Sequence, residues 1–237
     1  SFEMAYDVAH AAYDQQQLTN IMTYAFEIYQ SVSELEDYEE FFSPLFVIFS
    51  HCIDNLKESV SSYFSPLLVG IKLIIDKTID YSAFKCLCSI SCVKSISVNM
   101  CVLQLIRYLR EGDVLCRKYT LSTIGKYFTQ MNIGDMLHEI PEILFDFIRD
   151  PYEDVEIKSM SLEAISDLIS AYTSEMMIHR RRLTDQCKQI FEFLDKYRFQ
   201  FEQYTDIACS LTITISILQR MYIGEEEKAD IDTCFGT

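Results

Sequence analysis

The chain has 237 residues, of which 49% are hydrophobic, and a formal net charge of −16 from 20 basic and 36 acidic residues. Such an acidic chain lacks the clustered lysines and arginines that bind nucleic-acid phosphates, so we expect no direct nucleic-acid binding and favour a basic protein partner. With 6 glycines and 4 prolines it has few turn residues for an all-β or α/β domain, and no uncharged run reaches the roughly 18 residues that membrane insertion requires.

Periodic apolar residues predict a series of helices along the first half of the chain. They cover 2–12, 18–32, 81–93 and 96–109. Two more are predicted after an acidic linker, where FFSPLFVIF (41–49) is echoed by YFSPLLVGI (63–71), because each Ser-Pro dipeptide is typical of a helix start. The longest apolar stretches span about 13 residues and are expected to form buried core helices. Gly112 and Asp113 mark a helix end and the N-cap of the next helix.

A helix over 114–131 is followed by a predicted helical hairpin over 133–172. Its first helix carries apolar residues at steps of three and four, contains Pro141 as a candidate kink, and ends at Arg149-Asp150-Pro151, because the residue before a proline avoids the helical conformation. The second helix has its apolar stripe at Ile157, Met160, Ala164, Ile165, Leu168, Ile169 and Tyr172. Such a hairpin cannot bury both stripes alone, so it needs similar neighbours on either side.

Helices over 175–197 and 201–222 and an acidic tail at 224–237 complete the chain. The total is about eleven helices of roughly 20 residues each with their turns, and a pair then gives a period near 40, which is typical of HEAT and armadillo repeats. We predict an all-α fold, a right-handed α-solenoid of five to six HEAT-like antiparallel helical hairpins over 1–223. The pairing of helices before residue 95 stays open. We expect the array to be a fragment of a longer solenoid and the tail to be disordered.

Neither the cysteines nor the histidines form a recognisable metal or catalytic site. Of nine cysteines, Cys86, Cys88, Cys92 and Cys101 stand in apolar helical contexts without a C-x-x-C pair, and the four histidines are scattered. We expect these cysteines to be small core residues in a reducing, intracellular compartment. The motifs of serine hydrolases, nucleotide-binding loops and zinc proteases are missing. The sequence therefore predicts no cofactor, no bound metal and no enzymatic activity.

The charge is unevenly distributed. Net charges are −10 over 1–60, +5 over 61–131 and −8 over 132–170. In the last segment Glu156, Glu163 and Asp167 lie at steps of seven and four, along one exposed line of the predicted second helix. Second helices of HEAT hairpins line the concave side of a solenoid, so these acids, with Asp150 and Asp154, are candidates for binding an Arg/Lys-rich segment. The alternative is that they are ordinary solvated acids.

Five segments share an order and hydrophobic register with a known family: CVLQLIRYL (101–109), LSTIGKYF (121–128), IPEILFDFI (140–148), SLEAISDLISAY (161–172) and ACSLTITISIL (208–218). They resemble the C-terminal HEAT repeats of importin-β, the nuclear transport receptor. The resemblance implies a cargo receptor of cytoplasm and nucleus whose acidic concave surface wraps a basic importin-α-type segment. That family often uses tryptophan on this surface, and this chain has none. The second hypothesis is another HEAT scaffold that joins folded proteins, of the phosphatase-scaffold or coat-adaptor type.

Overall fold

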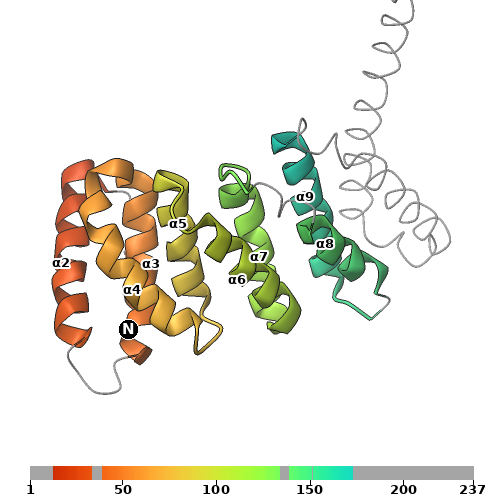
Figure 1. Ribbon diagram of the computed structural model, residues 1–237, viewed down its shortest axis with the longest axis horizontal. Coiled ribbons are helices and arrows are strands. Elements are labelled where there is room, and N and C mark those ends of the chain that lie inside the picture. The colour runs from red at the N-terminus through yellow and green to blue at the C-terminus, as the bar shows by residue number, and fades with distance from the viewer. Residues whose placement is uncertain (1–12, 34–38, 134–138, 151, 173–237) are drawn as a thin grey trace, which may run out of the picture. The chain divides into compact units, whose positions relative to one another are not determined.

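The computed structural model describes residues 13–33, 39–133, 139–150 and 152–172, and Figure 1 labels their helices. Within these ranges all regular structure is helical and no strand occurs, which confirms the predicted all-α class. The predicted helices over 2–12, 175–197 and 201–222, and the tail over 224–237, lie outside the described residues. The chain divides into two compact units after Gly112, the first of which also includes 131–133.

The first unit is built from helices at the places that the apolar periodicity predicts. In chain order they are α2 (Gln15–Ser33), α3 (Glu39–Leu56), the 3-10 segment η1 (Lys57–Tyr63), α4 (Phe64–Ile75), α5 (Tyr81–Lys94) and α6 (Val98–Glu111). Asp80 caps α5 by accepting the backbone N–H of Ala83 at 2.8 Å, and Gly112 follows α6 as predicted. Pro66 lies in the first turn of α4, as expected, whereas Pro44 lies inside α3 and removes one backbone hydrogen bond there.

The segment Phe41–Ile75 is apolar enough, by length and composition alone, to pass as a membrane-spanning helix, with a mean hydropathy of 1.2. It is not one continuous α-helix, because Lys57 has a left-handed φ of 54° and Val60 leaves the helical region with a φ of −108°. The part within α3 packs against both α2 and α5, and Phe46 is fully buried. Most of the apolar residues of α3 therefore lie in the core of the first unit, as the sequence predicts, whereas Phe41 is exposed.

An aromatic cluster joins α2 to α3 and α4. The ring of Tyr29 lies 4.9 Å from that of Phe42 and 5.9 Å from that of Phe49, measured between centroids. The Tyr29 hydroxyl donates a hydrogen bond to the carbonyl of Pro66 at 3.2 Å. Gly70 is required by this contact, because a Cβ atom there would lie 2.1 Å from the Tyr29 hydroxyl oxygen. The phenol ring thus sets how closely α2 and α4 approach.

In the first unit each helix runs in the same direction as the next helix but one in the chain. The hydrogen bonds between these alternate helices join residues at similar sequence separations. Tyr29 of α2 bonds Pro66 of α4, 37 residues on, and Thr23 bonds Tyr63, 40 residues on. The Ser43 hydroxyl in α3 donates to the Asp80 carboxylate at the start of α5, 37 residues on. Finally, an Arg107 guanidinium N–H near the end of α6 donates to the Ile75 carbonyl at the end of α4, 32 residues earlier, at 2.7 Å.

The second unit contains α7 (Val114–Thr123), the π-helical segment η2 (Ile124–Phe128), α8 (Glu139–Arg149) and α9 (Val155–Ala171). Packing of α8 against α9 confirms the predicted hairpin, and α8 ends at Arg149 as expected. Ile133 is not helical, although the prediction began the first helix there, and Pro141 lies in the first described turn of α8. The predicted helix over 114–131 is helical to Phe128 and is π-helical over its last five helical residues.

Both helices of the hairpin bury most of the predicted stripe, with two corrections, because Met160 and Tyr172 are only half-buried. Buried residues include Ile140, Ile143, Leu144, Phe145 and Ile148 in α8, and Ile157, Ala164, Ile165 and Leu168 in α9. Leu162 is also buried, whereas Met160, which the prediction placed in the stripe, is only half-buried. The reason is that α9 packs against α7 as well as α8, so that its buried surface is wider than one stripe and is turned toward both neighbours.

The alternation of parallel helices recurs in the second unit. Lys118 in α7 reaches Glu156 in the first turn of α9, 38 residues on, while the Tyr172 hydroxyl just after α9 donates to the Phe128 carbonyl at the end of η2, 44 residues earlier. The starts of the two helices therefore meet, and so do their ends. In the chain α8 lies between α7 and α9, and α9 packs against both of them. As in the first unit, a helix therefore contacts the next helix but one in the chain.

Candidate functional site

The predicted acidic site begins at the N-terminus of α9. The Asp154 carboxylate caps the helix by accepting the backbone N–H groups of Glu156 at 2.9 Å and Ile157 at 3.3 Å. Burial by itself raises the pKa of Asp154, but the hydrogen bond from Lys118 and these two backbone donors outweigh it, and the pKa is lowered. Asp154 is therefore ionised at neutral pH and has a structural task in starting α9.

Lys118 of α7 neutralises part of the predicted acidic line. Its ammonium lies 2.5 Å from a carboxylate oxygen of Glu156 and 3.3 Å from one of Asp154. The hydrogen bond to Glu156, followed by that to Asp154, raises the pKa of Lys118, although desolvation opposes the shift. Two of the five predicted ligand acids are thus already paired within the chain, and the pairs join the N-terminal half of α7 to the start of α9.

A second group of charges lies in the loop between α8 and α9. Arg117 pairs with Glu153 at 2.8 Å, and its guanidinium lies 5.4 Å from the centre of the Phe147 ring. Burial lowers the pKa of Lys158, and the nearby carboxylates of Asp150 and Glu153 oppose that shift. Asp150 is therefore part of a mixed-charge cluster, in which its carboxylate also accepts the backbone N–H of Tyr152 at 2.9 Å.

Asp167 faces the π-helical segment. One of its carboxylate oxygens would lie 2.3 Å from a Cβ atom added at Gly125, so a larger residue at position 125 would force the Asp167 side chain to move. Burial raises the pKa of Asp167, although the side chain as a whole remains exposed. The hydroxyl of Thr129 donates to the Gly125 carbonyl at 2.7 Å. Asp167 thus presents one side to solvent and the other to η2.

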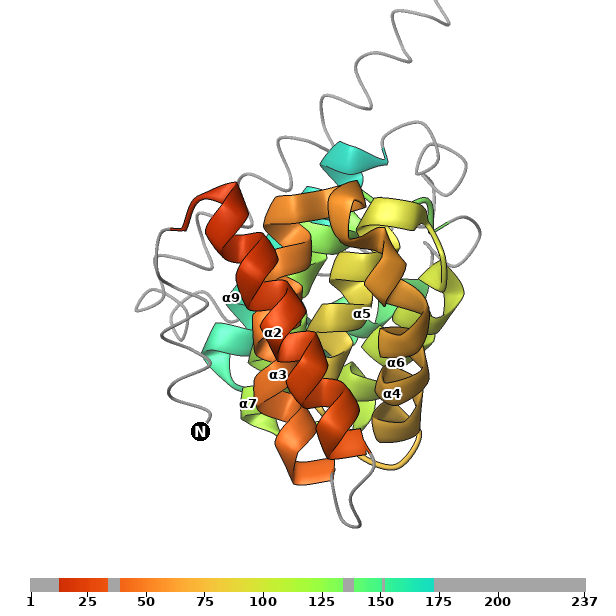
Figure 2. The same cartoon turned by 90° about the vertical axis from the view of Figure 1, so that its left-hand side faces the viewer.

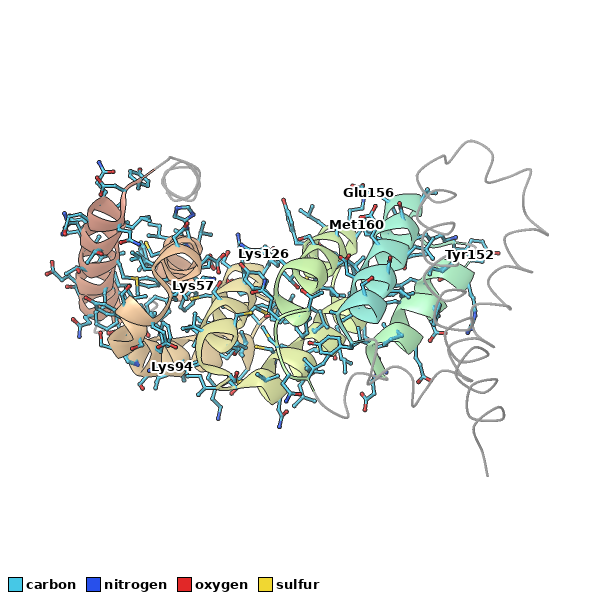
Figure 3. The ribbon with its side chains drawn as sticks, turned by 90° about the horizontal axis from the view of Figure 1, so that it is seen from above. Lys57, Lys94, Lys126, Tyr152, Glu156 and Met160 are labelled. Carbon is cyan, nitrogen blue, oxygen red and sulfur yellow. The ribbon has the colours of Figure 1, made fainter. Side chains whose placement is uncertain are left out.

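Glu163 is the predicted acid that the structure leaves most open, since it is exposed and no ion pair involving it occurs among the described residues. Figure 3, which labels Glu156 and Met160, shows both side chains on the same side of α9. The structure therefore separates the predicted site into acids that are bonded within the chain, Asp150, Asp154 and Glu156, and an available part, Glu163 and Asp167. Within the part of the chain that the structure describes, only Glu163 and Asp167 of the five predicted acids can bind a basic ligand without first leaving a lysine or backbone N–H partner.

The basic members of this surface, Arg117, Lys118 and Lys158, were missed by the sequence analysis. A signal for two of them exists. Arg117 and Lys118 precede their acidic partners by 36 and 38 residues, which is close to the predicted repeat period of about 40. Opposite charges separated by one repeat are therefore candidates for ion pairs between stacked helices.

The buried cysteines are the other cluster that could have carried chemistry. Cys52, Cys86, Cys88 and Cys101 are buried in the first unit, as predicted for small core residues, and Cys92 is half-buried. Burial raises the pKa of the Cys52 thiol to about 12 and raises those of Cys86 and Cys88 as well. In the part of the chain that the structure describes, no group of three or more His, Cys, Asp or Glu side chains is arranged to hold a metal ion.

Comparison with protein-family models, with curated proteins and with solved structures finds no match for this chain.

Proposed function

We propose that this chain is a protein-binding scaffold of the α-solenoid class, in which stacked helical hairpins present an extended surface to a partner. The observation that carries the proposal is the recurrence of parallel alternate helices. Their cross-contacts join residues separated by 32 to 40 positions in the first unit and by 36 to 44 in the second. A recurring separation of this size is what stacked units of two helices produce, and such arrays typically act by binding other proteins.

The partner surface that we propose is the available part of the acidic line, Glu163 and Asp167 of α9, and the ligand is an Arg/Lys-rich segment. The described residues of the second unit carry 10 acidic and 5 basic side chains, so their net charge is −5. A negative surface of this kind attracts a cationic segment and accelerates its association. A nuclear transport receptor of the importin-β type, shared between cytoplasm and nucleus, is the finer form of this proposal.

A fluorescently labelled Arg/Lys-rich peptide tests this function by its change in anisotropy when the protein is added at low salt. The double variant Glu163→Gln/Asp167→Asn removes two negative charges from α9 without changing side-chain size. At about 1 kcal/mol or less for each of the two exposed charge pairs, binding should weaken by up to about thirtyfold and become less sensitive to salt. The matched control is Glu27→Gln/Glu58→Gln, which makes the same change of net charge on exposed positions of the first unit. Equal loss of affinity in both variants would show that only net charge matters.

The second candidate is a scaffold that joins folded proteins, of the phosphatase-scaffold or coat-adaptor type. The ion pairs of Lys118 with Asp154 and Glu156 favour it. These two acids hold α9 against α7 and are therefore less available to a basic ligand. A parent protein that fails to bind the basic peptide at low salt, yet forms a stable complex with a folded partner, would replace the first candidate by this one.

A further inference from the structure

The first unit exposes apolar side chains on the outer surface of α4 and α6. Val69 and Leu73 of α4 are 64% and 45% exposed, and Leu103 of α6 is 57% exposed. They are not residues of a loosely packed helix, because the opposite faces of the same helices are fully buried, as Ile71 and Leu105 show. Aliphatic side chains this exposed, gathered on neighbouring helices, are typical of a surface that binds another molecule.

These three residues belong to one surface. Both α4 and α6 pack against α5, and the guanidinium of Arg107 joins their C-terminal ends through the carbonyl of Ile75 at 2.7 Å. Figure 2 shows α4 and α6 together on one side of the first unit. Because the buried face of each helix is turned toward α5, the exposed stripes are turned away from it, and we call this outer surface of the two helices the α4–α6 face.

The α4–α6 face is basic in a chain that is otherwise strongly acidic. It carries the cations Lys72, Lys77, Arg107 and Arg110 and the acids Asp76 and Glu111, for a net charge of +2. Arg107 has a structural task, since it also pairs with Glu111 at 3.0 Å. Lys72 and Arg110 are exposed and lie in the last turns of α4 and α6, where a cation is favourable next to the helix C-terminus.

We propose that the α4–α6 face binds an acidic amphipathic helix of a partner protein. The apolar residues of such a helix would cover Val69, Leu73 and Leu103, while its carboxylates would pair with Lys72 and Arg110. An amphipathic helix supplies both kinds of contact at once, because residues three and four apart share one face. This site is separate from the acidic surface of α9 and takes a ligand of the opposite charge.

A lipid surface fits these observations less well than an acidic helix. Three exposed aliphatic side chains offer little area to insert into a bilayer, and the carboxylates of Asp76 and Glu111 on the same face would be repelled by anionic headgroups. The net charge of −16 opposes approach of the whole chain to an anionic membrane. A short acidic helix can instead place its charges beside Lys72 and Arg110 and avoid the two acids.

The probe is a labelled synthetic helix of about 18 residues, with leucines at steps of three and four and glutamates beside them, whose binding to the full chain is followed by fluorescence anisotropy. We expect Leu73→Ser/Leu103→Ser to weaken binding by about tenfold or more, because serine lacks the apolar surface that each leucine would bury in the complex. Lys72→Glu/Arg110→Glu should weaken it by a similar factor and reverse its salt dependence. A scrambled peptide of the same composition should bind weakly.

The control is Leu115→Ser/Tyr119→Ser, which removes a comparably exposed apolar pair from α7 in the second unit and should leave binding unchanged. None of the substituted side chains is buried, so thermal unfolding should stay close to that of the parent and show that each variant folds. Binding of the basic peptide should also be unchanged in both α4–α6 variants, which separates this inference from the proposed function.

Three results would overturn the proposal. In the first, the acidic helix binds the leucine and charge variants as tightly as the parent. In the second, vesicles containing phosphatidylserine bind the parent and lose binding in the same variants, while the acidic helix does not bind. In the third, sedimentation equilibrium shows that the parent self-associates through this face and that the variants are monomeric, which would make a second copy of the chain the occupant.

Discussion

The two units keep alternate helices in register by different chemistry. In the first, the bonds between them come mostly from hydroxyl and guanidinium donors to uncharged oxygens, as with Tyr29 to Pro66 and Arg107 to Ile75, around a core of aliphatic, phenylalanine and cysteine side chains. In the second, the ion pairs of Arg117 and Lys118 hold the helices near the start of α9, and one neutral hydrogen bond, from the Tyr172 hydroxyl to the Phe128 carbonyl, holds them at its end. A similar spacing of helices can thus be kept by contacts that salt and pH hardly affect, or by contacts that both can weaken.

The largest loss of unfolding free energy is expected when a buried phenylalanine in the aromatic cluster of the first unit is replaced. Phe46 is fully buried between α2 and α5, whereas Phe41, five residues earlier on the same helix, is 57% exposed. Phe46→Ala should lower the free energy of unfolding by about 3–5 kcal/mol, because it leaves a cavity among side chains that cannot fill it. Phe41→Ala should change it by less than about 0.5 kcal/mol. Urea denaturation measures both, and equal effects would contradict the assignment of this core.

The second unit should respond most to the loss of Arg117. The side chain of its partner Glu153 is only 8% exposed, so Arg117→Ala leaves a nearly buried carboxylate without this cation and removes the contact with Phe147. A loss of about 2–3 kcal/mol is expected in denaturant unfolding, below the full cost of breaking a completely buried pair because Arg117 is partly exposed. Arg149→Ala, which removes an exposed pair with Asp146, is the control and should cost less than about 1 kcal/mol.

Loss of hydrogen bonds between uncharged groups in the first unit should lower the free energy of unfolding by less than loss of Arg117. The buried hydroxyl of Tyr108 donates to the Asp80 carbonyl at 3.1 Å and accepts the Asp80 backbone N–H at 3.0 Å, which fixes the loop before α5. Tyr108→Phe should therefore cost about 1–2 kcal/mol, and the cost should be the same at low and high salt. Tyr24→Phe, at an exposed position, serves as the comparison. A salt-dependent loss for Tyr108→Phe would contradict the neutral character of these contacts.

The smallest effect is expected from Asp154, and it depends on pH. Because the pKa of Asp154 is lower in the folded state, its stabilising contribution is complete above the unfolded value near pH 3.9 and is lost as the pH falls through the folded value. Asp154→Asn keeps a good N-cap but cannot bind Lys118 as an ion. Melting temperatures of the variant should fall less steeply than those of the parent below about pH 4. If the melting temperatures of variant and parent fall equally steeply at low pH, Asp154 contributes nothing to the pH dependence of stability.

The helices could be predicted from the sequence because each depends on residues close together in the chain. The break at Gly112 and the end of α8 at Arg149 follow from local backbone preferences, and both are confirmed. The π-helical segment was not predictable in this way. Its glycine, Gly125, reads as an ordinary helix-weakening residue until the carboxylate of Asp167, 42 positions later, is placed against it.

The candidate site was only partly predictable for the same reason. The steps between Glu156, Glu163 and Asp167 show that they share a helix face, but they do not show which of them already have a cation beside them. Lys118 lies on a different helix, and its distance to Glu156 depends on how α7 and α9 stack. Residue spacing within one helix therefore predicts a line of acids, while the number available to a ligand is set by the neighbouring helix.

The alkylation rate of the buried thiols in the first unit reports how often this part of the chain opens. Alkylating reagents attack the thiolate, and burial both hides Cys52, Cys86 and Cys88 from the reagent and keeps their thiols protonated. Modification at these positions must wait for a fluctuation that exposes them, so its rate follows the population of the opened state. Cys116 in the second unit is only half-buried and should react sooner. Peptide mapping after timed alkylation would therefore show how often the first unit opens under native conditions, without any denaturant.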